Sequence, residues 1–188
     1  MPTHVALLRG INVGGPSRRV AMAELRGVVE SLGHTEVATY IQSGNVVFTS
    51  SEADPAVLSA ALEAAIADRL SVRCPVVVLD RAEFAQVVAD NPYPDEPDPK
   101  KVHVVFRAVA PGPEEIAAVA AAEERAGAKG SRDAATVLGR AVYLHLPDGM
   151  GRSELAAQLG KLPTKGVADG GGTARNWATV LKLQTMLG

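Results

Sequence analysis

The stretch EVATYIQSGNVVFTS, residues 36–50, decides the fold. It holds two runs rich in β-branched and aromatic residues, separated by Ser43, Gly44 and Asn45. Because glycine and asparagine tolerate the positive φ angles of tight turns, this pattern predicts a β-hairpin. The hairpin lies between two predicted helices, and each helix has a predicted strand on its outer side.

These flanking elements follow from equally local patterns. HVALLRG, residues 4–10, is an apolar run ended by glycine and predicts a strand, while residues 21–32 carry apolar side chains at helical spacing. Asp54 followed by Pro55 is typical of a helix N-terminus, and CPVVVLD, residues 74–80, predicts a buried strand. The resulting order, β-α-β-β-α-β, is that of the ferredoxin-like split βαβ plait, an α+β fold.

The chain changes character after this unit. Asp80 and Glu83 indicate a capping box at the start of a short helix. DNPYPDEPDPKK, residues 90–101, then predicts a linker, because prolines interrupt both helices and central strands. The linker acids expected to face solvent are Asp95, Glu96 and Asp98.

The second half of the chain repeats the pattern of the first. Its predicted elements are a strand (102–109), a helix (113–126), a hairpin (135–146) and another helix (153–159). This β-α-β-β-α order predicts a second, related α+β subdomain. The predicted division is a ferredoxin-like subdomain (1–80), a short helix with the linker (81–100), and a second α+β subdomain with a C-terminal helix (101–188).

The C-terminal stretch GGGTARNWATVLKLQTMLG, residues 170–188, predicts that last helix. Thr173 is expected to be its N-cap, which would place Arg175 in its first turn. An arginine is unfavourable near a helix N-terminus, so a bound anion or a paired carboxylate would explain it. In the alternative interpretation, Arg175 pairs with the acidic linker and Asn176 supports the cap.

The composition excludes several classes of protein. The 188 residues have a formal net charge of −2, which argues against a globally basic nucleic-acid binder. Cys74 is the only cysteine, so no intramolecular disulfide can form, and its side chain is expected to fill the core. No signal-peptide pattern and no apolar run of membrane-spanning length occur in the sequence, which predicts a cytoplasmic protein without a membrane partner.

The loop that follows the first predicted strand, within LLRGINVGG (residues 7–15), is rich in glycine and locally basic. Its glycine spacing matches a Walker A motif, but Pro16 stands where that motif needs its phosphate-binding lysine. The dinucleotide motif G-x-G-x-x-G is absent as well. What is left is a loop with Arg9, Arg18 and Arg19 that leads into a helix N-terminus, a setting that attracts anions. The alternative is that the glycines only turn the chain.

Strand order brings this loop close to the hairpin tip. In a β-α-β-β-α-β unit, the first loop and the hairpin tip lie at the same end of the sheet. The residues expected to face one another are Asn12, Gly14 and Gly15 from the loop and Gln42, Ser43 and Asn45 from the tip. This cluster would either contact a ligand or hold the two loops together.

No catalytic or metal-binding pattern emerges from the sequence. The histidines, which are scattered without metal-ligand spacing, are His4, His34, His103 and His145. No G-x-S-x-G nucleophile motif occurs, and RNA recognition through an RNP1 motif is disfavoured because Phe48 is the only aromatic residue on its strand. Neither a metal nor a cofactor is predicted, and nucleic acid is an unfavoured partner that the sequence leaves open.

Four segments together carry a family resemblance: ALLRGINVGG, AELRGVVESLG, TYIQSGNVVF and TARNWATVLKL. The chain resembles a bacterial family described only as domain of unknown function 1697, over nearly its whole length. The resemblance implies an α+β protein with ferredoxin-like plaits and brings no established activity. Members often carry a lysine or a similar polar residue after the double glycine, where this chain has Pro16. If that side chain contacts an anion in the family, this chain would use Arg18 or Arg19 instead or bind the anion more weakly.

The function that the sequence favours is binding of a small anionic or phosphorylated ligand through the two basic glycine-rich loops. The residues predicted to contact it are Arg9, Asn12, Gly14, Gly15, Gln42, Ser43 and Asn45 in the first half and Thr173, Arg175 and Asn176 in the second. One alternative is an enzyme that acts on a phosphate or acyl group in a cleft between the subdomains. Another is a structural or protein-interaction role, for example in a homodimer.

Overall fold

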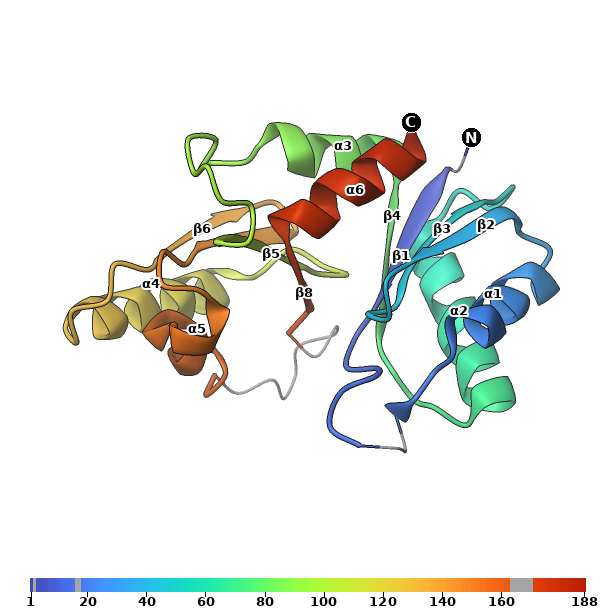
Figure 1. Ribbon diagram of the computed structural model, residues 1–188, viewed down its shortest axis with the longest axis horizontal. Coiled ribbons are helices and arrows are strands. Elements are labelled where there is room, and N and C mark those ends of the chain that lie inside the picture. Colours follow the sequence, from blue (N-terminus) through green and yellow to red (C-terminus); the bar gives the residue numbers. More distant parts are fainter. Residues whose placement is uncertain (2, 16–17, 163–170) are drawn as a thin grey trace. The chain divides into compact units, whose positions relative to one another are not determined.

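The computed structural model describes residues 1, 3–15, 18–162 and 171–188. Pro16 and Gly170, which two of the predictions above involve, lie outside these ranges. The chain forms two compact units (Figure 1). Unit 1 consists of Met1–Val88 and Leu181–Gly188, and unit 2 consists of Ala89–Val180. Each unit contains one four-stranded antiparallel sheet.

Unit 1 has the predicted split βαβ plait. The strands of its sheet, sheet A, are β1 (His4–Leu8), β2 (Thr35–Tyr40), β3 (Asn45–Thr49) and β4 (Val76–Asp80). Their order across the sheet is β2-β3-β1-β4, and every neighbouring pair is antiparallel. Helix α1 (Met22–Ser31) connects β1 to β2, and α2 (Pro55–Leu70) connects β3 to β4. Figure 1 shows both helices on the same face of the sheet.

Strands β1, β3 and β4 of sheet A are buried on both faces. The side chains that face α1 and α2 are Ala6, Leu8, Val46, Phe48, Val76 and Val78, and they pack against apolar residues of the two helices. Those on the other face are Val5, Leu7, Val47, Val77 and Leu79, each at most 2% exposed. Burial on both sides explains why these strands are unbroken apolar runs rather than alternating ones. Cys74 belongs to the helix-side core as predicted, and burial raises the pKa of its thiol to about 11.

The local signals for helix starts in unit 1 are confirmed. Asp54 is the N-cap of α2, and its carboxylate accepts a hydrogen bond from the backbone N–H of Ala56 at 2.8 Å. Helix α3 (Arg81–Ala89) begins with the predicted capping box. In it, Asp80 Oδ1 accepts from Glu83 N at 2.8 Å, and Glu83 Oε2 accepts from Asp80 N at 3.2 Å.

The linker after α3 has neither helix nor strand, as predicted, but it is attached to unit 2. The ring of Tyr93 stacks on His145 with 5.2 Å between centroids, and Glu96 Oε2 lies 2.7 Å from His145 Nε2. The prediction that Glu96 belongs to a solvated face is therefore wrong, because its side chain is only 12% exposed. Sequence spacing alone could not place a histidine of a distant strand against the linker.

Unit 2 repeats the plait. The strands of its sheet, sheet B, are β5 (Val102–Phe106), β6 (Ala134–Leu138), β7 (Ala141–His145) and β8 (Thr173–Asn176). The helices that connect them are α4 (Pro113–Gly127), a short 3-10 helix, η2 (Met150–Arg152), and α5 (Glu154–Leu159). The order of the four strands across sheet B is β6-β7-β5-β8, which is the order of sheet A with each strand replaced by its counterpart. The two units therefore share one topology, β-α-β-β-α-β.

The predicted N-cap at Thr173 is wrong. Thr173 lies in β8 and pairs with Phe106 of β5, so it belongs to a strand that the sequence analysis did not predict. The last helix, α6 (Trp177–Leu187), begins four residues later, and Asn176 Oδ1 accepts from Thr179 N at 2.9 Å as its cap. A threonine after glycines is a local helix-start signal, and pairing with a distant strand overrides it here.

The hairpin tip of sheet A requires glycine at position 44. Gly44 has a φ of +72°, and a Cβ there would lie 2.7 Å from Leu8 Cβ. Replacing Gly44 with alanine is expected to lower the free energy of unfolding by about 2–4 kcal/mol, from the left-handed backbone and the overpacking together. Gly27→Ala is the matched control, because Gly27 lies within α1 with open space around it, and it should raise stability by about 0.5–1 kcal/mol. Urea denaturation measures both, and a Gly44→Ala variant as stable as the parent would contradict this account of the tip.

Candidate functional site

Three connections of unit 1 lie at one end of sheet A, which we call the loop end. They are the β1–α1 loop (9–21), the β2–β3 tip (41–44) and the α2–β4 connection (71–75). The antiparallel register fixes this arrangement, since Leu7 pairs with Asn45 and Leu8 pairs with Val76. The predicted meeting of the first loop and the hairpin tip is thus confirmed.

Asn12 joins the loop to the tip. Its Nδ2 donates to the backbone carbonyls of Gln42 at 2.8 Å and Val20 at 3.0 Å, and its Oδ1 accepts from Val20 N at 2.9 Å. Its own backbone N–H donates to the carbonyl of Arg18 at 2.8 Å. The side chain is therefore occupied by the protein itself, so its direct role is to hold the two loops together.

Backbone strain collects at the loop end. Asn12 has a φ of +55° and Ile41 a φ of +49°, and a β-branched residue such as Ile41 is rarely found in this left-handed region. Gly14 and Gly15 also have positive φ, at +74° and +134°, and a Cβ at either position would meet nothing within 4 Å. These two glycines allow the loop backbone to take left-handed conformations, and both are exposed. Such strain is often found at ligand sites.

An open depression of about 460 Å³ lies between the loop and the tip. The residues that line it are Asn12, Gly15, Arg19, Val20, Ala21 and Gln42. None of these side chains is acidic or aromatic. Ala21 is the N-cap of α1, and its side chain makes no cap hydrogen bond to the first N–H groups of that helix. Arg19 is exposed and makes no hydrogen bond or ion pair with any other residue that the structure describes.

The other predicted residues of this half differ in accessibility. Arg9 is half-buried directly after β1, and Ser43 is exposed at the tip. Asn45 is completely buried, and its Nδ2 donates to the Tyr40 carbonyl at 3.0 Å, so its side chain closes the hairpin. Sequence reasoning missed Val20 and Ala21, although an alanine at a helix N-cap, where a polar residue is usual, was a readable signal.

The predicted residues of the second half lie in unit 2. Thr173, Arg175 and Asn176 are all in β8, so Arg175 is not in the first turn of a helix and the dipole argument for it is wrong. The guanidinium of Arg175 is buried and donates to Thr173 Oγ1 at 2.7 Å and to the Ala174 carbonyl at 2.8 Å. Burial lowers the pKa of Arg175 to about 10. A role of these three residues in ligand binding stays a prediction.

The matching loop of unit 2 is built differently. Arg107 follows β5 as Arg9 follows β1, and its Nη2 lies 2.9 Å from Glu115 Oε1 in an ion pair. The other Glu115 oxygen accepts from Gly112 N at 3.1 Å, and these contacts lower the pKa of that carboxyl group. Glu24 holds the same position in α1 that Glu115 holds in α4, yet among the described residues it has no such partner. In unit 2 the carboxylate at this helix position neutralises the loop arginine, and in unit 1 Glu24 makes no such contact with the residues that the structure describes.

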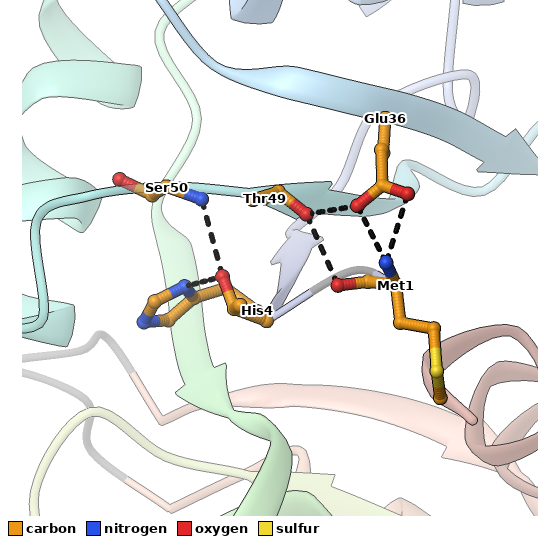
Figure 2. Close-up of polar contacts among 6 residues, drawn as sticks. Met1, His4, Glu36, Thr49 and Ser50 are labelled. Atoms are coloured by element: carbon orange, nitrogen blue, oxygen red, sulfur yellow. Dashed lines mark hydrogen bonds and ion pairs between the residues drawn. The ribbon is translucent and has the colours of Figure 1, made fainter.

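The opposite end of sheet A gathers carboxylates that are already engaged. Figure 2 shows Glu36 with both oxygens 2.8 Å from the N-terminal amino group of Met1, while Thr49 Oγ1 donates to it at 2.6 Å. The same figure shows His4, whose Nδ1 lies 2.8 Å from Thr3 Oγ1. His4 and His34 both lie against the ring of Phe48, and burial lowers the pKa of each.

Comparisons with known proteins identify the family. The model of the family described as "Protein of unknown function (DUF1697)" matches residues 1–143. The chain belongs to the DUF1697 family. A solved structure described as conserved bacterial protein SP0830 from Streptococcus pneumoniae is similar over 100% of this chain and 99% of its own, with 24% sequence identity and a TM-score of 0.72. This similarity confirms the α+β fold. No curated protein matches the sequence.

The described part of this DUF1697 protein contains neither a metal-ligand cluster nor a membrane-spanning helix. Within residues 1, 3–15, 18–162 and 171–188, no group of three or more His, Cys, Asp or Glu side chains is arranged to hold a metal ion. In the same ranges, none of the helices combines the length and the apolar character needed to cross a bilayer.

The Asn12 contacts predict a graded loss of stability. Asn12→Gly keeps the left-handed backbone and removes the side-chain hydrogen bonds, which should lower the free energy of unfolding by about 1–3 kcal/mol. Asn12→Ala removes the same bonds and adds about 1–2 kcal/mol of backbone strain. Urea denaturation measures this order, and hydrogen exchange should show faster exchange in residues 41–44 of both variants. Equal stability of the parent and both variants would show that Asn12 does not hold the loop end.

Proposed function

We propose that this DUF1697 protein binds a phosphate-bearing ligand in the depression at the loop end of unit 1. The observation that carries the proposal is the composition of that depression. It combines the exposed guanidinium of Arg19 with a helix N-terminus whose N-cap, Ala21, makes no side-chain cap hydrogen bond, and none of the described residues that line it is acidic.

The physical basis is the charge of these groups. The first N–H groups of an α-helix have no acceptor within the helix and carry a partial positive charge, so phosphate oxygens are suitable partners. A guanidinium can donate two parallel hydrogen bonds to one phosphate, and such bonds are stronger than neutral ones. Gly14 and Gly15 allow close approach because both are exposed and have no side chain of their own. Arg19 and the start of α1 would hold the ligand from two sides.

Unit 2 supports this interpretation because it has the same topology, and there an ion pair neutralises the arginine of the corresponding loop. There, Glu115 accepts from both Arg107 and the N–H of Gly112, which is the N-cap of α4. A carboxylate of the protein thus neutralises Arg107 beside the start of α4, whereas Arg19 beside the start of α1 has no such partner among the described residues. This difference favours a ligand over a purely structural role for the unit 1 loop.

Binding is favoured over catalysis at this site. The lining side chains are amide, guanidinium and small apolar groups, and none of them is a usual nucleophile or general base. A stacking platform is absent from the lining residues as well, so a nucleobase would gain little here. The ligand would be recognised mainly by its phosphate.

Replacing Arg19 tests the proposal. Isothermal titration with inorganic pyrophosphate should show saturable binding to the full chain, and Arg19→Ala should weaken it about tenfold, which corresponds to about 1.4 kcal/mol. Arg69→Ala is the matched control, because Arg69 is an exposed arginine of unit 1 in the last turn of α2, outside the depression, and its removal changes the net charge equally. Binding that is absent in the parent, or that Arg19→Ala leaves unchanged, would refute the proposal.

A further inference from the structure

We infer that the ligand carries a chain of phosphates, which extends from the depression toward Arg18 and Arg73. This inference rests on the proposed function and goes beyond it by naming the class of ligand. The first phosphate would lie at Arg19 and the start of α1. The following phosphates would lie along the surface where the β1–α1 loop meets the α2–β4 connection.

That surface is continuous in the structure. The backbone N–H of Arg9 donates to the carbonyl of Pro75 at 2.9 Å, which joins the two connections directly. Arg18 Nη1 lies 3.4 Å from the carbonyl of Gly10, beside this junction. Arg18 and Arg73 are both exposed, and they belong to the two connections that meet at this junction. Arg19 directly follows Arg18 in the chain.

The distribution of charge in unit 1 favours a ligand with several negative charges. The arginines at the loop end or in the last helical turn that leads to it are Arg9, Arg18, Arg19, Arg69 and Arg73. The carboxylates in the same region are Glu24, Glu63 and Asp68, and Glu63 already accepts a hydrogen bond from Val76 N at 2.8 Å. A surface with such an excess of positive charge attracts polyanions.

The opposite end of the sheet shows the reverse distribution. The carboxylates there are Glu36, Glu52, Asp54, Asp80 and Glu83. Figure 2 shows one of them, Glu36, held by the N-terminal amino group, and Asp54, Asp80 and Glu83 accept hydrogen bonds from helix N-termini. These carboxylates form their contacts at the opposite end of the strands, so they do not neutralise the positive charge of the arginines at the loop end.

The identity of the basic residues points to phosphate rather than to anions in general. No lysine precedes Lys100, so all basic side chains of residues 1–88 other than histidines are arginines. Arginine differs from lysine in binding phosphate through a planar, two-pronged contact. The depression is also larger than a single phosphate requires, since its volume of about 460 Å³ lies in the range of sites for larger ligands. Without aromatic or acidic lining residues, the remaining space suits further phosphates better than a base or a sugar.

Titration with phosphates of increasing length tests the inference. Orthophosphate, pyrophosphate and tripolyphosphate are compared at fixed ionic strength, without divalent cations, on the full chain. Affinity should rise at least tenfold from orthophosphate to tripolyphosphate. Arg73→Ala should weaken tripolyphosphate binding about tenfold and leave orthophosphate binding within twofold, whereas Arg19→Ala should weaken both. Thermal melting of each variant establishes that it is folded.

The outcomes separate this inference from the proposed function. If Arg73→Ala binds tripolyphosphate as the parent does, while Arg19→Ala is weakened, the extended ligand is refuted and phosphate binding in the depression stands. If Arg69→Ala loses as much affinity as Arg73→Ala, the length dependence reflects general surface charge, and the inference is refuted. If the parent binds none of the three phosphates, the proposed function is refuted with it.

Discussion

The side chain of Asn12 holds the loop end of unit 1 together, and the candidate site depends on it. One amide closes the β1–α1 loop onto Val20 and ties it to the hairpin tip at Gln42. These contacts fix the two walls of the depression and the entry of the chain into α1. Asparagine suits the position because it tolerates the left-handed backbone while it both donates and accepts hydrogen bonds. Asn12 therefore gives the β1–α1 loop its shape, and the proposed anion would contact the outer surface of that loop.

The two units show how one topology can carry two different loops. In unit 2, Arg140 Nη1 donates to the Ala108 carbonyl at 2.7 Å, so a tip side chain reaches the loop, whereas in unit 1 a loop side chain reaches the tip. The ion pair of Arg107 with Glu115 then neutralises the arginine that directly follows β5 in unit 2. The shared plait supplies the position of the loops, and a few side chains decide whether charge is left over for a ligand.

Most of the fold could be predicted because its signals are local. The hairpin at Gly44, the N-cap at Asp54 and the capping box of Asp80 with Glu83 each depend on neighbouring residues only. Strand β8 was missed, because its four residues become a strand only by pairing with β5. The site was predicted in part: topology placed Asn12 opposite the tip, but only the structure shows that Asn45 is buried and that Val20 and Ala21 line the depression. Such facts depend on packing between distant segments, which no local pattern records.

The most direct measurement of the central claim is a nuclear magnetic resonance titration of the ¹⁵N-labelled chain with pyrophosphate. The account predicts saturable shifts of the backbone amides of Gly15, Met22 and Ala23, at the depression and the start of α1. The amides at the start of α4, around Glu115, should stay unchanged because the Glu115 carboxylate already neutralises Arg107 beside them. Shifts of equal size at both helix starts, or none at the depression, would contradict the claim that unit 1 alone keeps an open anion site.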